Sequence, residues 1–236
     1  MAPDLPYFLP GPTGRDLTHT LLGVVTVDLA IGLLVYAAWL LVIREPAADL
    51  APHWLRQRFR PPAAASSSRP AKVALLVASL VVGTLTHLAW DFFTHPGPLE
   101  DFMPFMGTQV GPMTPTKWLQ HGSSLFGLGV IMWWTARWVR RTEPVPTPSR
   151  LSGSARVTTW LAVVGTFVAV ALLVWSTGVI DGYPALDPYL VFTIARKSIG
   201  AAIVVAGAAV VAWQVDRLER DYSDRSTATT LPSTSA

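Results

Sequence analysis

The residues best suited to chemistry lie in the run GTLTHLAWDFFTH, residues 83–95, where His87, Asp91 and His95 follow one another at four-residue steps. Four residues of an α-helix rise about 6 Å and turn about 40° past a full circle, so the three side chains are expected on one face. Ionisable groups inside an apolar segment of membrane-spanning length are costly and usually mark function. Imidazole and carboxylate are also common ligands of zinc and similar divalent ions. The run therefore predicts a metal site.

Three further residues are placed to join this site from other parts of the chain. Asp4 and His19 precede or open the first apolar stretch, and His121 opens the third. We expect Asp4, His19, His87 and Asp91 to be metal ligands. His95 and His121 are expected to complete the ligand shell or to move protons. The structural alternatives are a buried His–Asp hydrogen bond on the helix, a turn-forming Asp4 and a histidine at the membrane interface.

The composition is that of an integral membrane protein. Of the 236 residues, 51% are hydrophobic and only 14% are charged, against roughly 25% charged in an ordinary soluble domain. No cysteine is present, so a metal would be held by His, Asp and Glu. The basic residues cluster in two loops and the tail without a nucleic-acid motif, so no nucleic-acid partner is expected and the bilayer is the expected surrounding.

The predicted fold is all-α, a polytopic helical membrane protein with about five transmembrane helices. Five apolar stretches of near-spanning length predict these helices, at residues 21–43, 73–93, 123–139, 158–180 and 199–215. Asp28 lies inside the first of them, where it is expected to hydrogen-bond a threonine or to pair with His87 as a supporting residue. The loop 94–118, with prolines between aromatic residues and methionines, suggests a structured cap on the membrane surface.

The positions of Lys and Arg predict the orientation. Fourteen of the 18 basic residues fall in alternate segments, which places the N-terminus outside and the C-terminus in the cytoplasm of a bacterial plasma membrane. These fourteen are Arg44, Arg56, Arg58, Arg60, Arg69, Lys72, Arg137, Arg140, Arg141, Arg150, Arg156, Arg217, Arg220 and Arg225. The same topology, which rests on Lys and Arg alone, places Asp4, His19, His87, Asp91, His95 and His121 at the outer face.

The chain divides by sequence into three parts. Residues 1–141 form a membrane domain with the metal site, residues 142–222 add two supporting helices, and residues 223–236 form a Ser/Thr-rich tail expected to be disordered. The first residues lack the basic and apolar regions of a signal peptide, so the spans themselves are expected to direct insertion.

Three blocks carry a resemblance to a known family. Residues 4–8 (DLPYF), 83–95 and 118–124 (WLQHGSS) together resemble a bacterial integral membrane family known as domain of unknown function 4184. The resemblance runs from the N-terminus to about Arg141. Members of that family typically have more sequence upstream, so the start at Met1 is expected to correspond to an internal position there, with one ligand missing.

A looser resemblance connects the chain with membrane-bound metal-dependent hydrolases and with zinc-dependent phospholipase C and P1-type nucleases. Those proteins combine an Asp, a His some fifteen residues later and a His-x-x-x-Asp, and Asp4, His19, His87 and Asp91 fall in that order. The further His and acid of a three-metal site have no clear match. The resemblance implies one or two zinc ions and hydrolysis of a phosphoester, in a lipid or its headgroup, at the extracytoplasmic face.

Two other classes of function stay open. One is a transporter or proton relay built on Asp28, His87 and Asp91, although the polar residues crowd one end of the spans and no internal repeat is visible. The other is a non-catalytic membrane scaffold or partner-binding protein, in which the outer residues would tolerate alanine with only a loss of stability.

Overall fold

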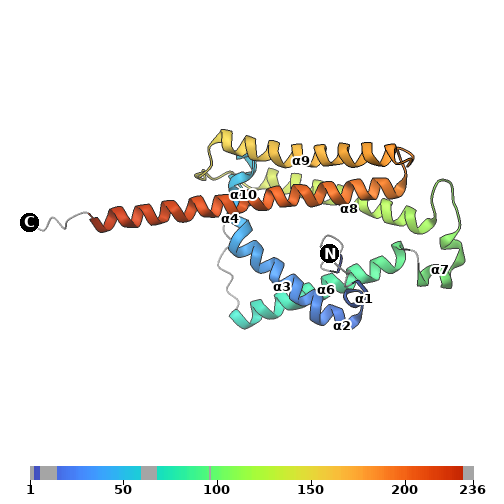
Figure 1. The fold of residues 1–236 in the computed structure, drawn as a ribbon. Helices are drawn as coiled ribbons and strands as arrows, with labels where there is room; N and C mark the ends of the chain where they lie inside the picture. The colour runs from blue at the N-terminus through green and yellow to red at the C-terminus, as the bar shows by residue number, and fades with distance from the viewer. Residues whose placement is uncertain (1–2, 6–14, 60–67, 96, 231–236) are drawn as a thin grey trace, which may run out of the picture. The chain divides into compact units, whose positions relative to one another are not determined.

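A computed structural model describes residues 3–5, 15–59, 68–95 and 97–230, and every regular element in these ranges is helical. The elements are α1 (Arg15–Thr18), α2 (Leu21–Gly23), η2 (Val24–Asp28), α3 (Leu29–Ala38), η3 (Trp39–Ile43), α4 (Arg44–Leu50), α5 (His53–Arg56), α6 (Arg69–Thr94), α7 (Pro98–Phe102), η4 (Pro104–Gly107), α8 (Pro115–Arg141), α9 (Gly153–Ile180) and α10 (Pro188–Thr230). The predicted all-α class is therefore confirmed (Figure 1).

Four helices are long and apolar enough to cross a bilayer: Leu21–Leu50, Arg69–Thr94, Gly153–Ile180 and Pro188–Ser223. They contain four of the five predicted spans. The remaining prediction, 123–139, lies inside α8, a 27-residue helix whose Ser, Gly and Trp residues make it less apolar. The structure thus supports four candidate spans within its described residues, and α8 is a long helix of mixed character.

The described chain forms two compact units. Unit 1 comprises residues 1–36 and 53–146, and unit 2 comprises residues 37–52 and 147–236. Unit 1 holds every residue of the predicted site. The helix that starts at Leu21 contributes its first part to unit 1 and its last part to unit 2.

The start and the end of α6 determine where His87 and Asp91 lie in unit 1. Its N-terminus follows Ser68 and has a proline in the first turn, where no intrahelical N–H bond is lost. Its C-terminus comes at His95, which is extended (φ −116°, ψ 147°). The residue before a proline is disfavoured in helix, and Pro96 follows. His87 and Asp91 therefore lie in the last two turns, on one face.

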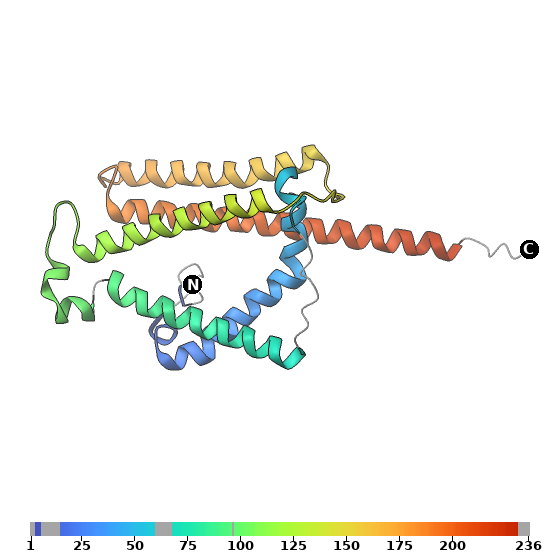
Figure 2. The same cartoon turned by 180° about the vertical axis from the view of Figure 1, so that it is seen from behind.

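The first long helix is packed against α6 through a small residue. A Cβ added to Gly32 would lie 3.0 Å from Leu80 Cδ2, so glycine permits a close approach of the two helices. Earlier in the same helix, η2 is a π-helical turn that contacts α6. Such turns are rare and occur often at functional sites. Figure 2 shows α6 next to the α2–α3 stretch.

The segment that joins α6 to α8 is structured, as the sequence suggested. Thr116 is fully buried, and its hydroxyl lies 2.9 Å from both Glu100 Oε1 and the Met106 carbonyl oxygen. Leu99 and Met106 are also buried. α7 and η4 are thereby held against the start of α8.

Unit 2 is organised by the buried carboxylate of Asp49. It accepts hydrogen bonds from the Trp213 indole (2.9 Å), the Ser149 hydroxyl and the backbone N–H groups of Arg150 and Leu151. α9 and α10 run side by side in both views (Figures 1 and 2). α10 stays helical to Thr230, past the start of the tail predicted at 223, and i,i+4 pairs such as Asp216–Arg220 favour its later turns. Residues 231–236 lie outside the described part of the chain.

Candidate metal centre

Asp4, His19, His87 and Asp91 come together at one point of unit 1. One ligand atom from each lies within 4.8 Å of those of the other three. His87 Nε2 is 2.9 Å from Asp4 Oδ2 and 3.5 Å from Asp91 Oδ2. His19 Nε2 is 3.6 Å from Asp91 Oδ2 and 3.8 Å from Asp4 Oδ1. All four side chains are partly exposed, which leaves the cluster accessible from outside.

These separations can be compared with the edges of a tetrahedral metal site. Zinc bonds of about 2.0–2.1 Å require ligand atoms to lie about 3.3–3.4 Å apart. The four distances above, 2.9 to 3.8 Å, scatter around that value. His87 Nε2 is buried and close to Asp4, yet it forms no hydrogen bond with the described residues. The nitrogen is therefore directed beside the carboxylate and not at it, as expected for two ligands that face a common ion. The donor set fits a divalent metal.

The four residues reach this point from three segments of the chain. α6 supplies His87 and Asp91, which share a face because they are four residues apart. His19 lies in the turn between α1 and α2, and Asp4 lies in the short segment 3–5 near the N-terminus. A Cβ on Gly23 would overlap the carbonyl oxygen of Leu17. Only glycine therefore allows the tight turn that presents His19.

Thr18 orients both the histidine beside it and the N-terminal segment. Its side chain is buried, and its hydroxyl donates to the carbonyl oxygen of Pro3 at 3.0 Å. The same oxygen is 3.2 Å from His19 Nδ1. Since the hydroxyl proton is directed to Pro3, the Thr18 oxygen accepts from Nδ1–H, which makes Nε2, beside Asp4 and Asp91, the nitrogen suited to a metal. Thr18 thus fixes Asp4 and His19 together.

His95 lies beside the cluster and contacts its outer carboxylate. Its Nδ1 is 3.5 Å from Asp91 Oδ1, the oxygen opposite the one that faces His19 and His87. Its Nε2 is 3.4 Å from the Gln120 amide nitrogen. Gln120 Oε1 accepts from Lys117 Nζ at 2.8 Å, which directs the amide N–H₂ toward His95. The Thr94 hydroxyl donates to the Trp90 carbonyl oxygen (3.0 Å), so its oxygen accepts from His95 Nδ1–H at 3.3 Å, and Asp91 Oδ1 lies slightly further from the same nitrogen.

His121 is not among the residues that the structure brings together. It is exposed on α8, and the neighbouring Gln120 provides the contact with the α6 end. α8 is held at this level by a hydrogen bond from Trp90 Nε1 to Ser123 Oγ at 3.2 Å. The sequence predicted that this part of α8 lies near the site but selected His121, whereas Gln120 is the residue that contacts His95.

Asp28 is a buried acid below the cluster. It is 1% exposed, and neither of its carboxylate oxygens forms a hydrogen bond within the ranges that the structure describes. The start of the first long helix and the end of α6 meet at the cluster, so these helices are antiparallel. Asp28 is one turn before Gly32, which faces Leu80, and so lies near the level of Thr84, one turn below His87.

Sequence reasoning missed two residues of the site, Thr18 and Gln120. Each is adjacent in sequence to a histidine that was singled out, and this adjacency was the available signal. The Thr18 side chain is buried, but burial of a threonine in a polar helix start has no sequence signature.

The fold and site define a helical membrane-type protein with a His/Asp cluster suited to a divalent ion. The chain matches the family described as a domain of unknown function (DUF4184) over residues 1–215 and belongs to that family. The match extends beyond Arg141 into α9 and α10, further than the three sequence blocks indicated. No protein of curated function and no solved structure matches the chain. The looser resemblance to metal-dependent hydrolases therefore stays a prediction.

Proposed function

We propose that the chain is a metal-dependent hydrolase of the membrane surface, with zinc as its metal. The proposal depends above all on one observation: two imidazoles and two carboxylates from three segments converge within 4.8 Å. Bringing two carboxylates together in a partly buried site is unfavourable unless a cation compensates their charge. Two His and two Asp supply the borderline nitrogen and oxygen donors that zinc accepts.

The proposal includes the arrangement in the membrane. α8 is treated as a fifth span, since 27 residues rise about 40 Å and end in Arg137, Arg140 and Arg141. With the basic loops in the cytoplasm, the N-terminus and the His/Asp cluster lie at the extracytoplasmic face of a bacterial plasma membrane. A substrate in the outer leaflet could then reach the cluster without a soluble channel. Cysteine labelling of positions 4 and 225 from each side of sealed vesicles tests this topology.

The proposed reaction is hydrolysis of a phosphoester in a lipid or headgroup. A divalent ion in this position would polarise the scissile bond and activate water. Asp4, His19, His87 and Asp91 hold that ion, and His95 lies beside Asp91. Lys117, beside Gln120, adds a positive charge at the mouth that suits a phosphate. A role for His121 in proton movement stays a prediction from the sequence.

The experiment measures release of phosphate ester products by the purified full chain from mixed phospholipid micelles and from a soluble phosphodiester. Wild type is expected to hydrolyse at least one of them in a zinc-dependent manner. His87→Ala should abolish this activity, whereas His53→Ala, which alters an exposed histidine of α5, should not. Equal turnover in both variants would refute the assignment of the active site.

Asp28 supports a second candidate function, an ion or proton relay. A buried carboxylate without a hydrogen-bond partner among the described residues is unfavourable inside a membrane segment and marks ion pathways in transporters. A proton current in proteoliposomes that disappears in Asp28→Asn would favour this alternative. A scaffold role predicts instead that alanine at His87 and Asp91 changes stability and nothing else.

A further inference from the structure

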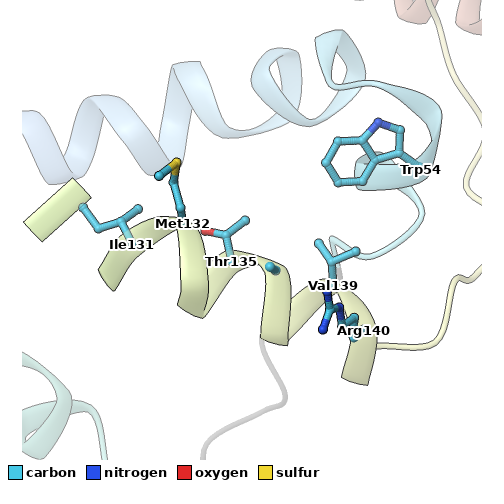
Figure 3. Close-up of a pocket in the computed structure, with 7 residues that line it drawn as sticks. Trp54, Ile131, Met132, Thr135, Val139 and Arg140 are labelled. Atoms are coloured by element: carbon cyan, nitrogen blue, oxygen red, sulfur yellow. The ribbon is translucent and has the colours of Figure 1, made fainter. Parts of the chain in front are cut away.

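Unit 1 carries a concave surface between α5 and the last part of α8, away from the His/Asp cluster (Figure 3). Its volume is about 440 Å³, and it is lined by Trp54, Ile131, Met132, Thr135, Val139 and Arg140, with Ala136 between them. Ile131 and Met132 lie at one end of the lining, and Val139 and Arg140 lie at the other, next to the indole of Trp54. The groove is thus apolar along its length and cationic at one end.

The two sides of the groove are held together by several contacts. Arg58 Nε donates to the carbonyl oxygens of Val139 (2.9 Å) and Thr142 (3.0 Å), and its Nη1 donates to the Trp54 carbonyl oxygen. These bonds satisfy carbonyl groups at the C-terminal end of α8 that have no helical partner. The rings of Phe59 and Trp138 also pack, with centroids 6.0 Å apart. The groove is therefore a preformed feature of the fold.

The positive charge at this end of α8 is not neutralised. Arg137, Arg140 and Arg141 lie within five residues, and α8 contains no acidic residue. In the part of the chain that the structure describes, none of the three forms an ion pair with a carboxylate. Arg137 lies over the Trp133 ring instead, 5.8 Å from its centroid. Arg140 is exposed and free to bind an anion.

The position along α8 identifies the surroundings of the groove. Gln120, which contacts the metal-site side of unit 1, and Arg140 are twenty residues apart on one helix, a rise of about 30 Å. This equals the thickness of the hydrocarbon core of a bilayer. Trp133, Trp134 and Trp138 lie where aromatic side chains anchor a helix at the interface. In the proposed arrangement, in which α8 spans the membrane, Arg140 is at the level of headgroups and Ile131 is at the level of acyl chains.

We propose that this groove binds one anionic phospholipid of the leaflet opposite the His/Asp cluster. The phosphate of the lipid pairs with the Arg140 guanidinium, and one acyl chain lies along Ile131, Met132 and Val139 against the Trp54 ring. A phospholipid has an apolar tail and an anionic head, and the groove offers apolar side chains at one end and the Arg140 cation at the other. The site is separate from the proposed metal site and does not depend on hydrolysis, but the leaflet assigned to it rests on the proposed membrane arrangement of α8.

The test measures lipid that stays bound to the intact chain. Protein purified in a mild detergent is incubated with equal parts of phosphatidylglycerol and phosphatidylcholine, and bound lipid is counted by native mass spectrometry. Wild type should retain phosphatidylglycerol in preference. Arg140→Gln should weaken this binding about fivefold, the effect of one cation near an anionic headgroup. Arg69→Gln, which removes an exposed arginine of α6 outside the groove, should have no effect.

A second pair of variants tests the apolar part. Ala136→Trp fills the groove and should reduce retention, whereas Ala162→Trp on an exposed face of α9 should not. Circular dichroism and gel filtration establish that each variant is folded. If Ala136→Trp does not fold, Arg140→Gln decides by itself. Equal retention of both lipids by wild type, or undiminished phosphatidylglycerol on Arg140→Gln, would overturn the proposal.

Discussion

Replacement of Thr18 by valine is expected to weaken the metal site without touching a ligand. Valine keeps the shape of threonine but lacks the hydroxyl that binds Pro3 at 3.0 Å and lies 3.2 Å from His19 Nδ1. The carbonyl oxygen of Pro3 would be left buried and unpaired, which costs about 1–3 kcal/mol. His19 would also lose the acceptor that fixes its tautomer. Loss of such a supporting hydrogen bond typically lowers metal affinity about 10–100-fold.

The two magnitudes are consistent, because a 10–100-fold change in affinity corresponds to about 1.4–2.7 kcal/mol. Zinc affinity is measured by competition with a chromophoric chelator on the purified full chain. Thr18→Ser, which keeps the hydroxyl, should bind zinc nearly as wild type does.

Thr26→Val provides the matched control, since the exposed Thr26 hydroxyl only donates to the Leu22 carbonyl oxygen of its own helix. It should leave the affinity within about twofold of wild type. If Thr18→Val also stayed within that range, the argument that Thr18 holds Asp4 and His19 in register would be refuted.

The remaining predictions concern other parts of the structure. Gly23→Ala should cost about 1–3 kcal/mol of stability and weaken zinc binding, because a Cβ there overlaps the backbone. Gly83→Ala has open space around it and should stabilise the protein by about 0.5–1 kcal/mol, because alanine favours the helix. Asp49→Ala should lower the free energy of unfolding by about 3–5 kcal/mol, because it removes the acceptor of several buried donors. Thermal unfolding measures this loss. Asp181→Ala, in an exposed turn, should leave the unfolding temperature unchanged. Asp28→Asn should leave bound zinc unchanged in a metal assay, because Asp28 is not among the four clustered residues.

Each of these predictions has an outcome that contradicts it. Equal unfolding temperatures for Gly23→Ala and Gly83→Ala would mean that the α1–α2 turn tolerates a side chain. An Asp49→Ala protein as stable as wild type would remove the carboxylate from its central place in unit 2. Loss of zinc in Asp28→Asn would make Asp28 part of the metal site.

The pairing of His87 with Asp91 could be predicted from sequence because it depends only on helix periodicity. The arrival of Asp4 could be anticipated from topology, since the ends of spans meet at the same face. The contact of Asp4 with the two histidines depends on the buried hydroxyl of Thr18, which holds the neighbouring Pro3. No local sequence pattern predicts this hydrogen bond between residues fifteen positions apart.

The residue of α8 that faces the site could not be predicted for a related reason. Gln120 and His121 differ by about 100° of helical rotation. The contact of Trp90 with Ser123 on neighbouring helices sets which of them faces α6. That rotation is a property of tertiary packing. Chemical type alone favoured the histidine, and the amide is the residue that contacts His95.

The boundaries of the long helices could also be predicted from the sequence only in part. Four of the five stretches predicted from hydropathy coincide with helices that are long and apolar enough to cross a bilayer, because a long apolar run fixes both length and character. Hydropathy was less informative for α8, in which glycine, serine and tryptophan dilute the apolar residues, and for the end of α10, where polar residues continue the helix through i,i+4 pairs.

The most direct test of the account is the metal content of the purified chain, measured by inductively coupled plasma mass spectrometry with X-ray absorption at the zinc edge. Wild type should carry about one zinc per chain, with nitrogen and oxygen ligands near 2.0–2.1 Å, and the double variant His87→Ala, Asp91→Ala should lose it. The matched double variant His53→Ala, Asp181→Asn should keep its metal. Full occupancy in the first double variant would contradict the account.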